Sequence, residues 1–184
     1  MKVSPHRSWN PRRFDARAFA EAGGVLESEE SLASFDRLSA EIHADGEVGT
    51  LVRWVVQGEI RPDAAGLSSV WMHLRAAIDL PVGCQRCLGP VVVPLEVDRW
   101  FRFVADESTA EAEDDQSEED VLALEPKPDL LALIEDELLM AMPLVPMHDA
   151  CPQPLQHSAG MVNGEEAASE VRPNPFATLS RLKK

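Results

Sequence analysis

Two long runs of alternating apolar and polar residues flank a short loop that holds two of the chain's three cysteines. The first run covers residues 67–82, the second covers residues 91–104, and the loop between them contains Cys84 and Cys87. A period of two places one set of side chains in a buried face and the other in water, as in a β-strand. Because glycine and proline interrupt the pattern on both sides of the cysteines, the sequence predicts an antiparallel hairpin with a Cys-x-x-Cys loop at its tip.

Further elements complete this hairpin. Residues 47–60 alternate in the same way and predict a preceding strand, which the turn-forming segment 61–66 joins to the hairpin. Three consecutive antiparallel strands form a meander, which is stable when something covers its apolar face. The strongest helix pattern covers residues 129–141, where Asp129 can cap the first turn and Pro143 ends the apolar stripe. We expect this helix to lie on the sheet.

The N-terminal third carries weaker signals. Asp15 can cap a short helix over residues 16–22, and Ser31 can cap another within residues 25–42. Arg99 interrupts the buried positions of the second hairpin strand, which predicts a β-bulge or an inward charge at a sheet edge. Together these elements predict an α+β fold: an antiparallel meander with a packed helix and extended basic termini. The pattern leaves open whether the sheet closes into a barrel.

Charge is distributed unevenly along the 184 residues, whose net charge is −15. Residues 105–120 carry nine acidic and no basic residues, and residues 171–184 carry four basic and no acidic ones. The length fits one domain, which we predict to be residues 1–170, with a solvated acidic loop at 105–120 and a basic tail at 171–184. The loop lacks the alternating ligands and glycine of a calcium loop, so a disordered insertion is the better interpretation.

The acidic centre of the chain repels the phosphate backbone, which excludes broad nucleic-acid binding through the central surface. Only the two basic ends favour contact with RNA, and an aromatic ring there can stack on a base, although an extended arm without a partner is the simpler interpretation. The candidate RNA-binding or partner-binding residues are Arg7, Trp9, Arg12, Arg13, Arg172, Phe176, Arg181, Lys183 and Lys184. An acidic body also attracts basic proteins.

Cys84 and Cys87 have the spacing of a zinc knuckle, in which a tight turn presents two thiolates to one metal ion. Two further ligands, His148 and Cys151, follow the 129–141 helix, so a Cys3His site forms if that segment returns to the hairpin tip. Reduced structural cysteines without a metal are the favoured interpretation, and the zinc site is the alternative. A dithiol redox role is disfavoured because Gly89 and the proline after it prevent the helix that such motifs begin, and covalent haem is excluded because no histidine follows the motif.

The sequence offers no catalytic constellation. Phosphate-binding glycine loops, nucleophile elbows and zinc-protease motifs are absent, so we expect no enzymatic activity and no small-molecule substrate. Residues Glu135–Glu137 indicate a solvated helix face rather than paired catalytic carboxylates, since adjacent helical positions do not share a face. No apolar run approaches the ~20 residues of a membrane span, no secretory signal is present and cysteines are few, so we expect a cytoplasmic protein without membrane contact.

Four motifs in order resemble the YceD family, the large ribosomal RNA subunit accumulation proteins. They are Cys84-Gln85-Arg86-Cys87-Leu88, then Asp129-Leu130-Leu131 through Glu135-Asp136-Glu137-Leu138-Leu139, then Pro143-Leu144-Val145-Pro146-Met147-His148 with Cys151, and finally Pro173-Asn174-Pro175-Phe176-Ala177 with Leu179 and Leu182-Lys183. The resemblance implies a cytoplasmic bacterial protein, without enzymatic activity, that supports synthesis, processing or stability of 23S ribosomal RNA. Some relatives carry a second cysteine pair where this chain has only Cys151, so a four-thiolate site is not expected.

Three functions compete. The first is an assembly factor of the large ribosomal subunit, whose partner is the subunit precursor, 23S rRNA or a basic ribosomal protein. The alternative is a zinc-binding structural or zinc-relay protein that uses the Cys84/Cys87 knuckle. An endoribonuclease is the least supported, because no cluster of histidine, lysine and carboxylate residues is apparent.

Overall fold

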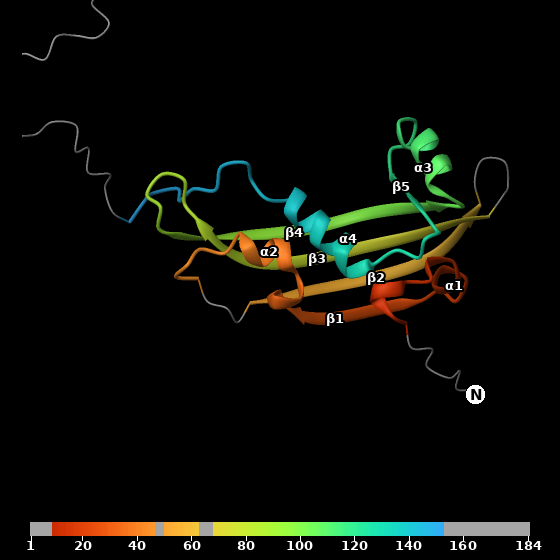
Figure 1. Ribbon diagram of the computed structural model, residues 1–184, viewed down its shortest axis with the longest axis horizontal. Helices are drawn as coiled ribbons and strands as arrows, with labels where there is room; N and C mark the ends of the chain where they lie inside the picture. Colours follow the sequence, from red (N-terminus) through yellow and green to blue (C-terminus); the bar gives the residue numbers. More distant parts are fainter. Residues whose placement is uncertain (1–8, 47–49, 63–67, 153–184) are drawn as a thin grey trace, which may run out of the picture. The chain divides into compact units, whose positions relative to one another are not determined.

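A five-stranded sheet with helices on one face forms the fold, as a computed structural model of residues 9–46, 50–62 and 68–152 describes it (Figure 1). The strand order is β1-β2-β3-β4-β5, so the sheet is open and not a barrel. The strands are β1 Val25–Ser31, β2 Leu51–Pro62, β3 Ser68–Gly83, β4 Pro90–Val104 and β5 Asp120–Ala123. The helical elements are η1 Pro11–Arg13, α1 Ala16–Glu21, η2 Leu32–Ser34, α2 Asp36–Ala40, α3 Glu107–Asp114 and α4 Leu130–Met140. The α+β class is confirmed.

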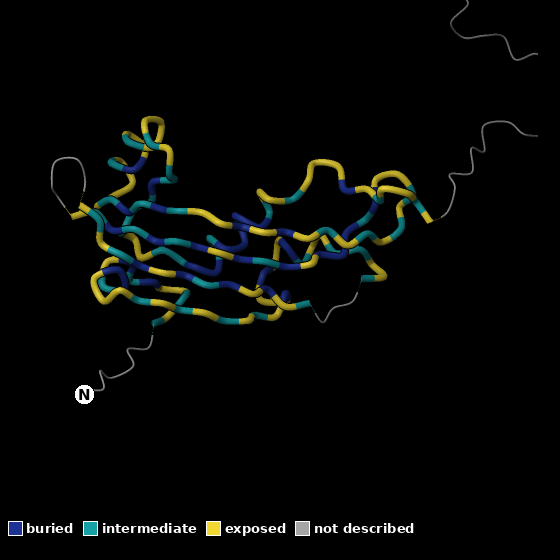
Figure 2. Tube along the Cα trace, turned by 180° about the vertical axis from the view of Figure 1, so that it is seen from behind, coloured by how far each residue is buried: buried dark blue, intermediate teal, exposed yellow. Residues whose placement is uncertain are grey.

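The predicted hairpin is the centre of the sheet. β3 and β4 pair in one continuous antiparallel register, from Val70 opposite Phe103 to Gly83 opposite Pro90. One face of β3 is buried at every second position, as the alternation predicts. Figure 2 shows how buried and exposed residues alternate along the strands. The buried apolar residues on this face of the two strands are Val70, Met72, Leu74, Ala76, Ile78, Leu80, Val82, Leu95, Val97, Phe101 and Phe103.

The two outer strands differ from the prediction. β1 occupies the first part of segment 25–42, for which we predicted a short helix; the helical prediction is met only further along, by η2, which Ser31 caps, and by α2. At the other edge, β5 pairs with β4 in parallel, so the sheet is mixed rather than purely antiparallel. Ladder hydrogen bonds to β2 hold β1 in place, since none of its residues is fully buried.

Helices α1 and α4 cover the apolar face of the sheet (Figure 1). Asp129 caps α4 by accepting hydrogen bonds from the backbone N–H groups of Leu131 and Ala132, as predicted. Asp15 caps α1 in the same way. α1 approaches β2 closely because Gly58 has no side chain: a Cβ there would lie 2.5 Å from a Phe19 ring carbon.

The acidic segment 105–120 is not the disordered loop that the sequence predicted. It contains α3, capped by Asp106, and returns to the sheet at β5. Arg102 in β4 binds the segment through Glu113 at 2.7 Å and Glu119 at 2.8 Å. A single half-buried guanidinium therefore offsets part of the repulsion between the carboxylates.

One further expectation for charged residues is decided and another is corrected. Arg99 sits opposite the buried Leu74 in an unbroken register, so no bulge forms; the alternative, an inward charge at a sheet edge, holds, and Arg99 pairs there with Asp120. Glu135 and Glu137 are 7% and 5% exposed, so the acidic side of α4 is not fully solvated. The predicted domain boundary at residue 170 lies outside the described residues. Within the described residues, no helix is long and apolar enough to cross a membrane.

Candidate metal centre

The loop between β3 and β4 closes tightly around the first cysteine. The backbone N–H of Cys84 donates to Gly89 O at 2.9 Å, and that of Leu88 donates to Cys84 O at 2.8 Å. Leu88 has a φ of 61°, the left-handed conformation that a leucine rarely adopts. This conformation turns the chain back into β4 directly after Cys87.

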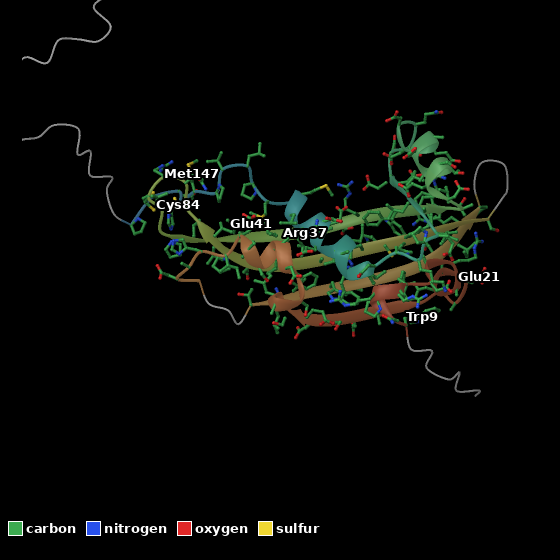
Figure 3. The ribbon with its side chains drawn as sticks, viewed as in Figure 1. Trp9, Glu21, Arg37, Glu41, Cys84 and Met147 are labelled. Carbon is green, nitrogen blue, oxygen red and sulfur yellow. The ribbon has the colours of Figure 1, made fainter. Side chains whose placement is uncertain are left out.

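The segment after α4 returns to this loop. The backbone N–H of Gln85 donates to Pro146 O at 2.9 Å, and His148 Nε2 donates to Pro90 O at 2.9 Å. Pro146 is buried. Figure 3 shows Cys84 and Met147 together at this end of the sheet, although they come from opposite sides of α4 in the sequence. Two hydrogen bonds thus join segments that lie about sixty residues apart.

The return brings together Cys84, Cys87, His148 and Cys151, whose ligand atoms all lie within 4.8 Å of one another. Cys84 Sγ lies 4.0 Å from Cys151 Sγ, and Cys87 Sγ lies 3.5 Å from His148 Nδ1. Zinc–sulfur bonds of about 2.3 Å at tetrahedral angles place two sulfurs about 3.8 Å apart. These distances therefore fit a tetrahedral zinc site with three thiolates and one imidazole.

The histidine is oriented for metal binding. A carbonyl oxygen can only accept, so the contact with Pro90 O places the proton of neutral His148 on Nε2. Nδ1, which faces Cys87, then carries the free lone pair. Metal-binding histidines generally donate their outer N–H to a carbonyl or carboxylate in this way.

Backbone N–H groups surround the Cys84 sulfur. Burial raises the pKa of Cys84, but hydrogen bonds from the backbone of Cys87, His148 and Arg86 outweigh burial and lower it to about 5. Burial and the neighbouring thiols raise the pKa of Cys151. One thiolate is therefore already favoured, whereas three thiolates at this spacing require a cation between them.

The comparisons with known proteins identify the family. The profile of the family described as "Large ribosomal RNA subunit accumulation protein YceD" matches residues 72–183, which include all four residues of the metal centre. The chain belongs to the YceD family. A Haemophilus influenzae member, named Large ribosomal RNA subunit accumulation protein YceD, is 36% identical over 116 residues, which are 62% of this chain and 66% of that relative. The chain thus aligns with just under two thirds of the relative's length. No solved structure matches the chain.

The YceD match begins in β3 and leaves out the first 71 residues, so β1, β2 and the first helices lie before it. It includes the hairpin, α4 and the segment that completes the metal centre. The resemblance stated from four short motifs is confirmed at the level of the family.

The structure describes three of the predicted RNA-binding residues. Trp9 is half-buried and packs edge-on against Phe19 with ring centroids 5.2 Å apart, so it does not belong to a free arm. Arg12 and Arg13 lie in η1 and are both exposed, and Arg12 forms an ion pair with Asp129 at 3.7 Å. The prediction of an extended N-terminal arm is therefore wrong for residues 9–13. The remaining candidates lie outside the described residues: Arg7, Arg172, Phe176, Arg181, Lys183 and Lys184.

Sequence reasoning missed the groups that support the ligands. The carbonyls of Pro146 and Pro90 accept the hydrogen bonds that hold the returning segment, and backbone carbonyls carry no signature in a sequence. The sequence also did not predict the left-handed conformation of Leu88, because a leucine gives no local indication of a positive φ. Only the Gly-Pro pair after it hinted at a tight turn.

Proposed function

We propose that this chain is a cytoplasmic, non-enzymatic factor that supports the accumulation of 23S ribosomal RNA during assembly of the large ribosomal subunit. The observation that carries the proposal is its membership of the YceD family, whose name describes large ribosomal RNA subunit accumulation. The similarity to the Haemophilus influenzae member bearing the same name supports it.

We also propose that zinc fills the metal centre and has a structural role. The ligands would be the sulfurs of Cys84, Cys87 and Cys151 and the Nδ1 of His148. Zinc sites with four protein ligands are structural, whereas catalytic sites keep one position open for water or substrate. Zinc bound there would link the hairpin tip to the segment after α4, which supports a factor that binds rather than catalyses.

Charge decides which parts of the chain suit RNA. The net charge of −15 favours basic proteins over phosphates as partners of the folded body. Residues 171–184, with four basic and no acidic residues, are the better candidates for contact with 23S rRNA or with the subunit precursor. The acidic body would then hold a basic ribosomal protein while the tail contacts RNA.

The proposal is tested in the native host by deleting the gene and measuring the ratio of 23S to 16S rRNA. We expect the ratio to fall at least twofold and the full chain to restore it. A chain truncated at residue 170 should restore it incompletely and recover less precursor particle at low salt. An unchanged ratio in the deletion strain would contradict the role in rRNA accumulation.

The absence of enzymatic activity is tested separately. Purified protein is incubated with a precursor transcript of 23S rRNA, with and without magnesium. We expect the transcript to remain intact, and specific cleavage that Cys84→Ser does not reduce would establish a nuclease instead.

A further inference from the structure

Exposed apolar side chains gather around the metal centre. Of the nine large apolar side chains that are exposed among the described residues, five form what we call the apolar cluster. Leu144 is 100% exposed, and Leu88 is 75% exposed. Apolar side chains gathered at one site on a small protein mark an interaction surface. The apolar cluster consists of Leu88, Val92, Leu144, Val145 and Met147.

The apolar cluster borders a groove. Residues Val91–Pro94 of β4 form one side of it, and Pro143 and Val145–Asp149 form the other. The groove encloses about 440 Å³. Its second wall is the segment that His148 and Cys151 attach to the hairpin tip, so the shape of the groove depends on the metal centre.

Leu88 is the least expected member of the cluster. Its φ of 61° favours glycine, and its side chain points into solvent. The backbone at this position has a structural role, since Leu88 O accepts a hydrogen bond from His43 Nε2 at 2.9 Å. The leucine side chain is mostly in solvent, so it contributes little to packing. A strained residue that fails to contribute to packing points to a function.

Three carboxylates lie on segments that carry or adjoin the apolar cluster. Asp149 lines the groove, and Asp79 lies opposite Pro94 in the sheet register. The backbone N–H of Asp45 donates to Nδ1 of His43, the histidine whose Nε2 binds Leu88 O. Arg86 is the one basic residue among those lining the groove. A partner that covers the cluster would therefore combine apolar residues with flanking lysine or arginine.

RNA suits this surface poorly. The apolar cluster contains no aromatic ring on which a base could stack, and the net charge of −15 disfavours contact with phosphates. On the open face of the sheet, Trp100 is already covered by the Arg61 guanidinium at 3.8 Å and by the stacked His73 ring at 4.3 Å. The observations favour a protein partner.

We propose that the apolar cluster docks an extended segment of a basic protein, with apolar side chains in the groove and cationic residues against Asp149 and the other acidic residues of the chain. The proposal deepens the proposed role in large-subunit assembly, on which it rests, by naming the chemical class of the partner and the surface that receives it. The metal centre holds one wall of the groove in place.

The test uses overlapping 20-residue peptides that cover all proteins of the large ribosomal subunit, with scrambled peptides as the baseline. The full zinc-loaded chain is compared with Leu88→Gly, Leu144→Ser and the control Val25→Ser, whose side chain is 60% exposed on β1. Leu88→Gly suits the left-handed backbone, so its zinc content should be unchanged and its Tm equal or up to about 4 °C higher.

We expect the wild-type chain to bind peptides with apolar residues and net positive charge. Both cluster variants should bind at least tenfold more weakly, and Val25→Ser within twofold of wild type.

Three results would overturn the proposal: no peptide bound above the scrambled baseline, Leu88→Gly binding as tightly as wild type, or Leu88→Gly weakening binding of a 23S rRNA transcript but not of peptides. The rRNA ratio of the deletion strain is an independent measurement. A normal ratio together with cluster-dependent peptide binding would remove the proposed function but keep the docking surface. A lowered ratio without peptide binding would remove the docking surface but keep the proposed function.

Discussion

Glu135 of α4 holds Arg37 of α2 through three hydrogen bonds, which the Arg37 backbone N, Nε and Nη2 donate at 2.7, 3.1 and 2.9 Å. The backbone N–H of Leu38 donates to the same carboxylate at 3.0 Å. Backbone N–H groups in the first turn of a helix have no partner within it. Glu135 therefore caps α2 from a position 98 residues away in the sequence and ties two helices together.

Glu135→Gln should lower the free energy of unfolding at pH 7. The amide keeps one accepting oxygen but loses the charge, and hydrogen bonds to charged groups contribute about 1.5–3 kcal/mol. Urea unfolding should show a loss in that range. The matched control is Asp136→Asn: Asp136 also binds Arg37, at 2.5 Å, but its side chain is 49% exposed. The control should lose less than about 1 kcal/mol.

The effect of Glu135→Gln should depend on pH. Burial raises the pKa of Glu135, but the N–H groups of Leu38 and Arg37 and the Arg37 guanidinium outweigh burial and hold it below its usual value. A lowered carboxyl pKa stabilises the fold above the unfolded pKa of about 4.3, and this contribution disappears as pH falls through the folded pKa. The difference between wild type and variant should shrink in acid. A constant difference between pH 7 and pH 3 would contradict the charge-based cap.

Glu137→Gln should have the opposite effect: it should raise the free energy of unfolding at pH 7. Burial raises the pKa of Glu137, Arg99 lowers it, and Asp120 and Asp136 raise it, with a net increase. A raised carboxyl pKa means that stability falls as pH rises from the unfolded pKa through the folded one. The amide removes this cost, so the variant should be more stable than wild type at pH 7 by roughly 0.5–2 kcal/mol and equal to it below about pH 4. Urea unfolding at the two pH values measures the change, and a loss at pH 7 would show that the contact with Arg99 dominates.

The parts of the fold that the sequence predicted are those that bury one complete face. β3, β4 and α4 each carry an apolar period, because each contributes that face to the core. β1 was missed because none of its residues is fully buried and three of its seven are glutamate, so it shows no apolar alternation. α3 was missed because carboxylate density indicated repulsion, whereas Arg102 comes from a strand eleven residues earlier than Glu113.

The metal centre was partly predictable for a related reason. Spacing alone paired Cys84 with Cys87 and His148 with Cys151, since each pair is local in the sequence. That the two pairs meet depends on the length of α4 and on where the chain leaves it, which only the packed structure fixes. The buried state of Glu135 was unpredictable because its partners, two backbone N–H groups and the Arg37 guanidinium, belong to another helix that is distant in the sequence.

Purified protein should contain about one zinc ion per chain. Cys84→Ser should reduce the zinc content below about half an equivalent, because it removes the buried thiolate of the donor set. His43→Ala is the matched control: His43 lies beside the same loop, bound to Leu88 O at 2.9 Å, but does not belong to the donor set. Elemental analysis should find its zinc content unchanged. Equal zinc in Cys84→Ser and wild type would place the metal elsewhere.

Chelation of the zinc should release the segment after α4 from the hairpin tip. Without the metal, only a few hydrogen bonds join the two, among them the one from Gln85 N–H to Pro146 O at 2.9 Å. Hydrogen exchange at the Gln85 amide should therefore accelerate at least tenfold, since local opening exposes it. The Leu133 amide, bonded to Asp129 O at 3.1 Å within α4, should change less than twofold. If both amides accelerate equally, the metal supports the whole fold; if neither does, hydrogen bonds and the burial of Pro146 hold the segment without help from the metal.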